Sequence, residues 1–338
     1  MSILTIKDLS AQTGYSVGTI SRVLNNQPNV SQKARETILR AAAESGFQLN
    51  ANAKQLKQQH SNSILVLVKG IHNELFGNLV ECIQAQVAET KYSLVVDYMD
   101  EAQNEVLRAI QLCREKKPLG ILFLGGDRDH FLADFSKITM PCVLVTCDAS
   151  RLPFPNLSSV TSDDVLAGRT AIEHLVSQGH KKIAIIGGPR IYSSMTQERY
   201  QGCSEAFRAN GVDFDDELDY ESVRFSFEWG YQAARKLLAK NRNYTAIFAM
   251  ADVLAIGAIR ALQDSGLRVP EDVSVVGLDG LTIGEYIVPR LTTISQNVEE
   301  LANRSMRILL ENIDERTAAH YEIVPVVLED RESARKLN

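Results

Sequence analysis

The stretch LTIKDLSAQTGYSVGTISRVLNNQPNVSQKARETILRAAAESGF, from Leu4 to Phe47, contains three short segments with the apolar spacing of helices. The first segment ends at Gly14, a residue that tolerates a positive φ at a helix end. Ser16 can cap a second helix over Val17–Leu24, after a turn of only a few residues. A third helix is predicted over Gln32–Ser45. Two short helices joined by a tight turn that contains Gly predict a helix-turn-helix.

The second predicted helix has two different faces. Its apolar face turns inward and carries Ile20, Val23 and Leu24. The opposite face has little apolar bulk, so it can enter a major groove and present hydrogen-bond groups to base edges. That outer face carries Val17, Gly18, Ser21, Arg22 and Asn25. The third helix is expected to turn Ala34, Ile38, Leu39 and Ala42 inward. A small helical subdomain with an ordinary polar face would show the same pattern, so the helices alone leave DNA binding open.

Charge divides the chain at about the same place. Residues 1–60 contain seven Lys or Arg and three Asp or Glu, a net charge of +4. The remainder contains 29 bases and 39 acids, a net charge of −10, which gives −6 for the whole chain. A small cationic head on an anionic body indicates that the head binds a polyanion while the body has another task.

The run TISRVLN at Thr19–Asn25, followed by Val30 and Ser31, resembles the DNA-binding head of the lactose/galactose repressor family. The resemblance implies that Val17, Gly18 and Arg22 read bases. It also implies that a set of polar residues mostly contacts phosphates, namely Thr5, Ser16, Thr19, Ser21 and Asn25, and that Asn29 approaches the groove edge. Gly18 has no side chain, so sequence recognition would depend on Arg22 and on DNA shape.

Residues 48–62 are polar and hold too few large apolar side chains to fold alone, which is typical of a linker. The resemblance implies that this hinge becomes a short helix on operator DNA. Leu56 would then pry open a base step in the minor groove, with Ala53 beside it. The chain departs from the family pattern at Leu49, where Pro is usual, and at Lys54, where Arg is common.

From Ser63 onward, short apolar runs alternate with amphipathic stretches. Strands are predicted at Ile64–Val68, Leu94–Tyr98, Gly120–Leu124, Val143–Cys147, Ile183–Ile186, Ala246–Met250 and Val273–Leu278. Helices are predicted at Leu75–Thr90, Asn104–Lys116, Asp164–Gln178 and Val253–Ser265, among others. This alternation predicts an α/β fold with doubly wound parallel sheets, and its length indicates two lobes.

The body also resembles the lactose/galactose repressor family, most specifically in GLRVPEDVSVVG at Gly266–Gly277. The resemblance implies two lobes like those of periplasmic sugar-binding proteins, joined by chain crossings near Thr161, Leu291–Thr293 and Val324–Val326. The expected organisation is a head over residues 1–47, a hinge over 48–62 and an effector and dimerisation domain over 63–338. Lobe one would hold about 63–161 and 292–324, and lobe two about 162–291 and 325–338.

Ligands of such folds bind beyond the carboxyl ends of the strands, between the lobes. By family resemblance, the effector pocket would be lined by Asn73, Phe76, Asp163, Arg199, Phe225 and Asp279. These side chains can bond hydroxyl groups or stack on a ring. Any one Asp after a strand is often only a helix cap. Ala251 stands where the family often has Asn, and Gln296 or Asp252 is expected to compensate.

Other motifs are missing. The chain has no leader segment and no run of 18 apolar residues, so it is expected to be cytoplasmic and outside the membrane. The five cysteines are scattered and the six histidines show no ligand spacing, which predicts free buried thiols and no metal site. No motif of a catalytic nucleophile or phosphate loop is present, so neither a catalytic residue nor a cofactor is expected.

The favoured interpretation is a ligand-responsive transcriptional regulator, expected to repress a carbohydrate-utilisation operon. It would bind a palindromic double-stranded operator as a homodimer. The effector stays open between a sugar, a sugar phosphate and a nucleoside or purine, and a protein corepressor is a further option. The alternatives are a kinase-like sugar enzyme with an added DNA-binding head, and a binding module whose head has lost DNA function.

Overall fold

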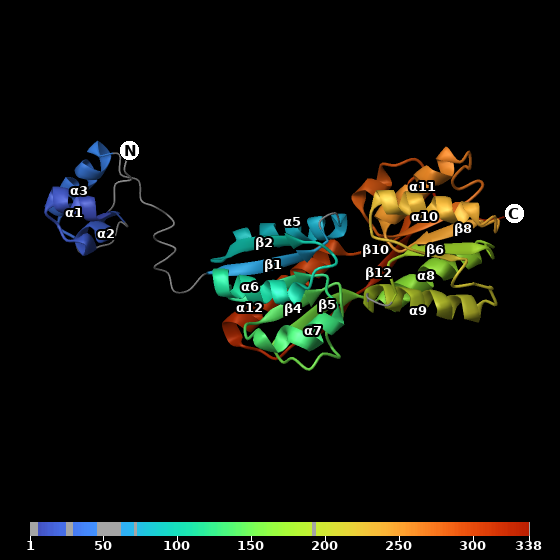
Figure 1. Cartoon of the computed structure of the whole chain (residues 1–338), viewed down its shortest axis with the longest axis horizontal. Helices are drawn as coiled ribbons and strands as arrows, with labels where there is room; N and C mark the ends of the chain where they lie inside the picture. The colour runs from blue at the N-terminus through green and yellow to red at the C-terminus, as the bar shows by residue number, and fades with distance from the viewer. Residues whose placement is uncertain (1–5, 25–29, 46–61, 71–72, 191–193, 338) are drawn as a thin grey trace. The chain divides into compact units, whose positions relative to one another are not determined.

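The computed structural model describes residues 6–24, 30–45, 62–70, 73–190 and 194–337. The chain folds as two units, residues 1–61 and residues 62–338. Each unit has hydrophobic clusters of its own. Figure 1 shows the helices and strands of both units with the labels used below.

The first unit contains the helices α1 (Ile6–Thr13), α2 (Val17–Leu24) and α3 (Gln32–Glu44). Gly14 has a φ of 74°, the conformation that ends α1. Ser16 Oγ accepts a hydrogen bond from the Thr19 backbone N–H at 3.2 Å, and Ser31 Oγ accepts one from the Ala34 N–H at 3.3 Å. The predicted helix positions and both serine caps are confirmed.

The core of the head is formed by Leu9, Ile20, Val23, Ala34, Ile38, Ala41 and Ala42. Leu39 was expected in this core, and that prediction was wrong because Leu39 is 47% exposed. Successive helical residues are rotated by about 100°, so Ala41 falls on the face of Ala34 and Ile38 while Leu39 turns away. The buried face of α3 is therefore lined mainly by alanines.

The first lobe of the second unit has six parallel strands: β1 (Ser63–Lys69), β2 (Ser93–Met99), β3 (Gly120–Leu124), β4 (Cys142–Val145), β5 (Leu157–Ser162) and β11 (Tyr321–Val324). Their order is β11-β5-β4-β3-β1-β2. Its helices are α5 (Glu74–Ala88), α6 (Glu105–Lys116), α7 (Arg128–Asp134), the short η1 (Phe135–Lys137) and α12 (Val298–Glu315). Alternate β1 residues pack on opposite sides, Val66 with α5 and α12, and Leu67 with α6 and α7. The sheet is therefore covered on both faces.

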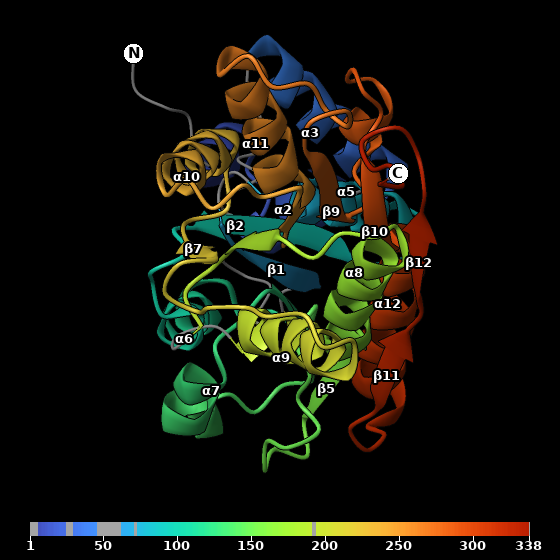
Figure 2. The same ribbon diagram turned by 90° about the vertical axis from the view of Figure 1, so that its right-hand side faces the viewer.

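The second lobe has the strands β6 (Ile183–Gly187), β7 (Tyr220–Ser222), β8 (Ala246–Ala249), β9 (Ser274–Asp279), β10 (Thr292–Gln296) and β12 (Val326–Glu329). Their order is β12-β10-β9-β8-β6-β7, and only β12 runs antiparallel to its neighbour. Its helices are α8 (Asp164–Ser177), α9 (Ser194–Ala209), α10 (Phe227–Ala239), α11 (Asp252–Asp264) and the short η2 (Thr282–Glu285). Figure 2 shows α8 and α9 on one side of this sheet and α10 and α11 on the other. The predicted doubly wound α/β class is confirmed.

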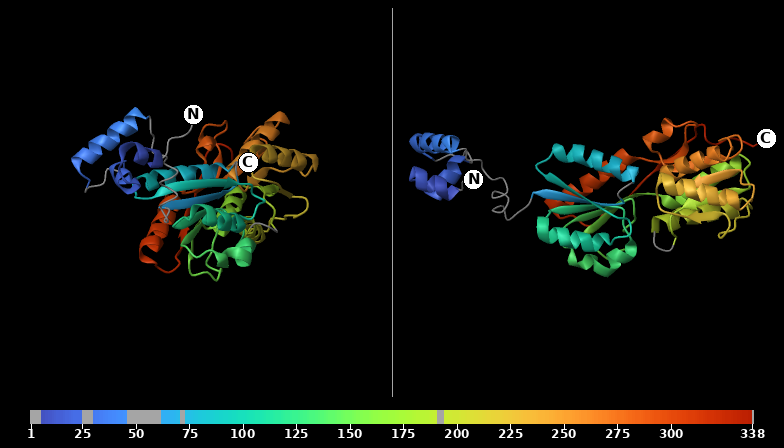
Figure 3. Two further views of the ribbon diagram at one scale, coloured as in Figure 1. Left: turned by 60° about the vertical axis from the view of Figure 1, so that its left-hand side comes forward. Right: turned by 45° about the horizontal axis from the view of Figure 1, so that its top comes forward.

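The chain passes between the lobes where a strand of one sheet gives way to an element of the other lobe (Figure 3). These passages lie at Asp163, at Asn297 and at Pro325. The second had been expected near Leu291–Thr293, and that prediction was wrong. Thr292–Gln296 forms β10, which pairs with β9, so this segment belongs to lobe two rather than lobe one. The composition of a strand with several Thr and Ser residues does not indicate which lobe contains it. Only the pairing with β9 shows that β10 belongs to lobe two.

The sequence predicted seven strands, and the described chain also contains β5, β7, β10, β11 and β12. These strands are short or rich in Ser and Thr, as in LSSVTS for β5 and TTISQ for β10. Hydrophobic runs identify strands that are apolar on both faces, and these five are not. Hydrogen bonds to neighbouring strands, rather than a run of apolar side chains, define these five strands.

Candidate functional site

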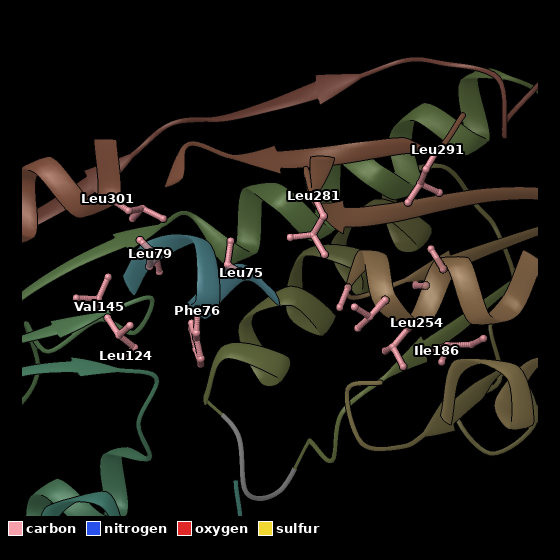
Figure 4. Packing of buried hydrophobic residues seen from close by; sticks show 14 of the residues in the cluster. Leu75, Phe76, Leu79, Leu124, Val145, Ile186, Leu254, Leu281, Leu291 and Leu301 are labelled. Carbon is pink, nitrogen blue, oxygen red and sulfur yellow. The ribbon is translucent and has the colours of Figure 1, made fainter. Parts of the chain in front are cut away.

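A cavity of about 30 Å³ lies between the two lobes of the second unit. Lobe one contributes Asn73, Leu75, Phe76 and Thr146 to its lining. Lobe two contributes Met195, Arg199, Phe225, Ala251, Val253, Asp279 and Leu281. Figure 4 shows Leu75 and Phe76 on α5 and Leu281 beyond β9, which belong to one apolar cluster that reaches across both lobes. Small-molecule sites usually enclose several hundred Å³, so a ring-sized ligand requires these side chains or lobes to move apart.

Five of the predicted effector residues are brought together in this lining, namely Asn73, Phe76, Arg199, Phe225 and Asp279. They come from sequence positions far apart, and their role in binding stays a prediction. Asp163 and Gln296 take other places. The Asp163 carboxylate accepts a hydrogen bond from the Leu166 N–H at 2.8 Å and caps α8. Gln296 lines a different hollow beside the crossings at Asn297 and Pro325.

Arg199 is held rigidly by the second lobe. Its side chain is 2% exposed, and its Nε donates to Asp164 Oδ1 at 2.7 Å while Nη1 donates to the Met250 carbonyl at 2.6 Å. Asp164 follows the first crossing and is equally buried. Burial raises the pKa of Asp164 to about 6, although the Arg199 guanidinium opposes this shift. At neutral pH the two side chains form a buried ion pair.

Close packing of α8 against α9 positions Arg199. Gly202 lies against the Val165 carbonyl of α8, and Gly168 lies against the Arg199 backbone. A methyl group at either glycine would overlap those backbone atoms. This contact explains the glycine in the ERYQG segment, Glu198–Gly202, because only glycine lets the helix carrying Arg199 approach so closely.

Asp279 ends β9 and faces the cavity with an unusual backbone. Its φ of 128° is rare for a residue with a side chain. Its Oδ1 accepts a hydrogen bond from Gln296 Nε2 at 2.8 Å, so Gln296 contacts the cavity through Asp279. Burial raises the pKa of Asp279, and the nearby Asp252 and Asp164 raise it further, while Arg199 and the Gln296 bond lower it.

Asp252 cannot replace the side chain that Ala251 lacks. Its Oδ1 accepts from Thr293 Oγ1 at 2.6 Å, and its Oδ2 accepts from the Leu281 N–H at 2.7 Å. The residue is fully buried, and it ties α11 to the loop after β9. The expectation that Asp252 compensates for Ala251 is therefore wrong, since its carboxylate is already bonded within lobe two.

Thr146 is a lining residue that the sequence interpretation missed. It follows β4, has a φ of 69°, and buries a hydroxyl for which the described residues supply no hydrogen-bond partner. A β-branched residue in the left-handed region is strained, and an unpaired buried hydroxyl adds a further cost. The sequence pattern placed Thr146 inside a strand predicted at Val143–Cys147, whereas β4 ends at Val145, so the rule that selects residues directly after strands passed over it.

Two ion pairs link the lobes near this cavity. Arg128 Nη2 lies 2.7 Å from Glu198 Oε1, and Arg224 Nε lies 3.0 Å from Glu101 Oε1. Arg128 and Glu101 belong to lobe one, and Glu198 and Arg224 belong to lobe two. Both pairs therefore favour the arrangement in which the lining residues meet.

The head presents several of the predicted DNA-contact residues to solvent. Val17 is 38% exposed, and Ser16, Gly18 and Arg22 are exposed, with Thr19 and Ser21 partly so. Ser16 Oγ lies 2.9 Å from Thr19 Oγ1, so these two hydroxyls are fixed at the start of α2. The other predicted contact residues lie outside the described residues, namely Thr5, Asn25, Asn29, Ala53 and Leu56.

All five cysteines are free, and Cys142, Cys147 and Cys203 are buried. The described residues bring no three His, Cys, Asp or Glu side chains together in a way that suits a metal ion. Among the helices of the described segments, none has both the length and the apolar character needed to cross a bilayer.

Comparison with known families follows this division of the chain. Residues 5–50 match the model of bacterial regulatory proteins of the lacI family, and residues 172–334 match that of a periplasmic binding protein-like domain. A helix-turn-helix head joined to such a domain defines the class of protein, a DNA-binding transcriptional regulator with a ligand-binding domain.

The regulator MalR of Clostridium butyricum is 32% identical over 333 residues, 98% of this chain and 99% of that protein. The lac repressor dimer bound to operator and the anti-inducer ONPF is 27% identical, with a TM-score of 0.77 over 99% of this chain and 100% of that one. The complex of the transcriptional regulator CelR with cellobiose is 29% identical, with a TM-score of 0.72 over 98% and 99%. This chain belongs to the lacI family of bacterial regulatory proteins.

The predicted family and fold are thereby confirmed. The chain aligns with these transcriptional regulators over nearly their whole length. This agreement favours the interpretation as a regulator over that as a kinase-like enzyme.

Proposed function

We propose that this protein represses a carbohydrate-utilisation operon and that a small molecule bound between its lobes controls its affinity for the operator. The observation that carries the proposal is the interlobe cavity, where polar and aromatic side chains from both lobes converge. A ligand that contacts both lobes stabilises one lobe arrangement over another, and this preference is the source of allosteric control.

The head supplies operator recognition in this proposal. Arg22 is exposed on α2 and would bond base edges, while Ser16 and Thr19 would hold phosphates at the start of that helix. One head contacts too few base pairs for high specificity. A twofold homodimer that reads a pseudo-palindrome doubles these contacts. A protein that binds operator DNA in bacteria acts in the cytoplasm.

The effector would contact Asp279, Arg199, Asn73 and Thr146 through hydrogen bonds, and Phe76 and Phe225 through their rings. Asn73 already caps α5, where its Oδ1 accepts from the Phe76 N–H at 3.4 Å, so its amide N–H₂ is the group that can donate to a ligand. Gln296 would act through Asp279, and Asp163 through the first turn of α8. The solved relatives with bound cellobiose and bound ribose support a carbohydrate effector.

Selection of operator sequences from random DNA, followed by footprinting, tests the DNA half of the proposal. We expect a symmetric site protected by a dimer, with log K falling by roughly 0.9 for each phosphate contacted as log salt rises. A single asymmetric half-site protected by a monomer would contradict it.

A thermal-shift panel of sugars, sugar phosphates, nucleosides and purines tests the part of the proposal that concerns the effector. A ligand at 100 times its Kd adds about 2.7 kcal/mol to the folded state. We expect a hit that Asp279→Ala abolishes and that changes operator affinity. Operator binding that responds to none of these compounds would point instead to a protein corepressor.

A further inference from the structure

Arg199 is the one basic side chain among the described residues that line the interlobe cavity. Two of the three guanidinium nitrogens of Arg199 already donate hydrogen bonds within the protein. Nε donates to Asp164 and Nη1 donates to the Met250 carbonyl, and both charged side chains are at least nine-tenths buried. Desolvation of this kind strengthens the interaction between paired charges, so the Asp164 carboxylate largely neutralises Arg199.

The carboxyl group of Asp279 lines the cavity, whereas Asp164 is not part of the lining. The one cation of the described lining is therefore already paired with an acid, and the other polar lining groups, those of Asn73, Thr146 and Asp279, carry no positive charge. Bases elsewhere around the cleft are also committed to acids: Lys69 to Glu105, Arg128 to Glu198, Arg190 to Asp216 and Arg224 to Glu101. A phosphate would have to enter beside the carboxyl group of Asp279, with no unpaired cation in the described lining to bind it.

We propose that the effector is an uncharged ring rich in hydroxyl groups, and that Asp164 excludes phosphate esters by neutralising Arg199. This inference rests on the proposed function and narrows its ligand to free sugars and nucleosides. Hydroxyl groups donate to Asp279, while Phe76 and Phe225 border the same space and pack on the apolar faces of a ring.

Asp164 acts as a positioning residue in this proposal. It lies behind Arg199 and contacts the cavity only through the guanidinium. Replacing it with Asn keeps an acceptor for Nε but removes the charge. Arg199 would then carry an uncompensated charge facing the cavity, and the ligand preference would shift toward anions.

Inorganic phosphate is the probe that tests this without knowledge of the effector. Thermal shift of the full chain would be measured at constant ionic strength for the wild type, Asp164→Asn and Glu173→Gln. Glu173 lies on the exposed side of α8, so the control variant loses the same single charge on the same helix. We expect saturable stabilisation only in Asp164→Asn, with an apparent affinity at least about tenfold above the wild type.

Two results would overturn the inference. One is saturable phosphate binding by the wild type that Arg199→Gln abolishes. The other is an Asp164→Asn chain that unfolds cooperatively yet shows no gain in phosphate affinity. Should Asp164→Asn fail to fold, Asp164→Ser offers a smaller acceptor to Nε, and the wild-type measurement still decides.

Calorimetry with matched pairs then examines the effector itself: ribose and ribose 5-phosphate, glucose and glucose 6-phosphate, cytidine and cytidine 5′-monophosphate. In any pair that binds, we expect the uncharged member to bind at least about tenfold more tightly. An ester that binds as well as its parent contradicts this inference alone. Absence of binding by every compound counts against the proposed function, and the phosphate titration still decides the role of Asp164.

Discussion

The Nη2 atom of Arg128 in lobe one lies 2.7 Å from the Oε1 atom of Glu198 in lobe two. Glu198 directly precedes Arg199 on α9. Arg128 is in turn fixed in its own lobe, where its Nε donates to the Asp148 carbonyl at 3.2 Å. The ion pair therefore joins lobe one to the helix that carries the central cation of the cavity.

We expect Arg128→Gln and Glu198→Gln each to lower the free energy of unfolding by up to about 1 kcal/mol, because the pair is partly exposed. The double variant should cost less than the sum of the two, and this coupling should vanish at high salt. Denaturant unfolding of the four proteins measures it. Arg260 and Asp264, an exposed pair within α11, provide a control that does not link the lobes. Strict additivity at low salt would show that the cross-lobe contact has no energetic role.

Gly18 offers a way to separate head stability from DNA recognition. A methyl group at this position would meet only Ser16 Oγ, at 3.8 Å, so the head has room for it. We expect Gly18→Ala to stabilise α2 by up to about 1 kcal/mol, since alanine is the better helix former. The same change should alter the preferred operator sequence, because it adds a side chain at a predicted base-reading position. Thermal unfolding and operator selection measure the two effects. An unchanged operator preference would argue against a base-reading role for residue 18.

Gly202→Ala is expected to disturb the effector site indirectly, through the packing of α9 against α8. The added methyl would overlap the Val165 carbonyl and push α9 away from α8, at a cost of about 1–3 kcal/mol. The hydrogen bond from Arg199 Nε to Asp164 should then be weakened. Gly77→Ala is the control, because it lies in helix α5 with nothing within 4 Å and should be neutral or stabilising. Similar melting temperatures for the two variants would refute this account of the ERYQG glycine.

The buried carboxyl of Asp279 should make stability fall with rising pH. Burial raises its pKa, so the folded chain holds the proton more tightly than the unfolded chain and releases it on unfolding. Its contribution to the free energy of unfolding therefore falls as pH rises from about 4 toward its raised folded pKa. The charged groups around it are Arg199, Asp252 and Asp164.

Asp279→Asn should remove this part of the pH dependence while leaving that of the exposed acids unchanged. Urea unfolding of both proteins at pH 5 and pH 8 isolates the difference. The variant should gain stability relative to the wild type at the higher pH. An identical pH profile in the two proteins would show that Asp279 keeps an ordinary pKa.

Thr146→Val should raise stability and lower effector affinity together. Valine keeps the branched shape but removes a buried hydroxyl that has no partner among the described residues, for a gain of about 1 kcal/mol. If the effector bonds that hydroxyl, its affinity should fall by about fivefold, the equivalent of a similar energy. Thermal unfolding with and without the effector found in the panel measures both. A loss of stability would indicate that the hydroxyl has a structural role instead.

Local signals in the sequence predicted the head well. Caps at Ser16 and Ser31 and a helix end at Gly14 depend on residues within one turn, and each lies where it was expected. The error at Leu39 arose because a leucine was given more weight than the helical phase. Phase decides which side of a helix is buried, whatever the size of the side chain.

The sequence by itself determined the strands that are apolar throughout, the helices between them and the charge division between head and body. Only the tertiary structure decided the contents of the cavity. Asn73 and Leu281 line one space because two separate sheets bring their strand ends together. Pairing with β9, and not composition, placed β10 in lobe two. The neutralisation of Arg199 by Asp164 likewise depends on a 2.7 Å contact between two helices. Local propensity acts over a few residues, whereas burial and ion pairing depend on neighbours that are distant in the chain.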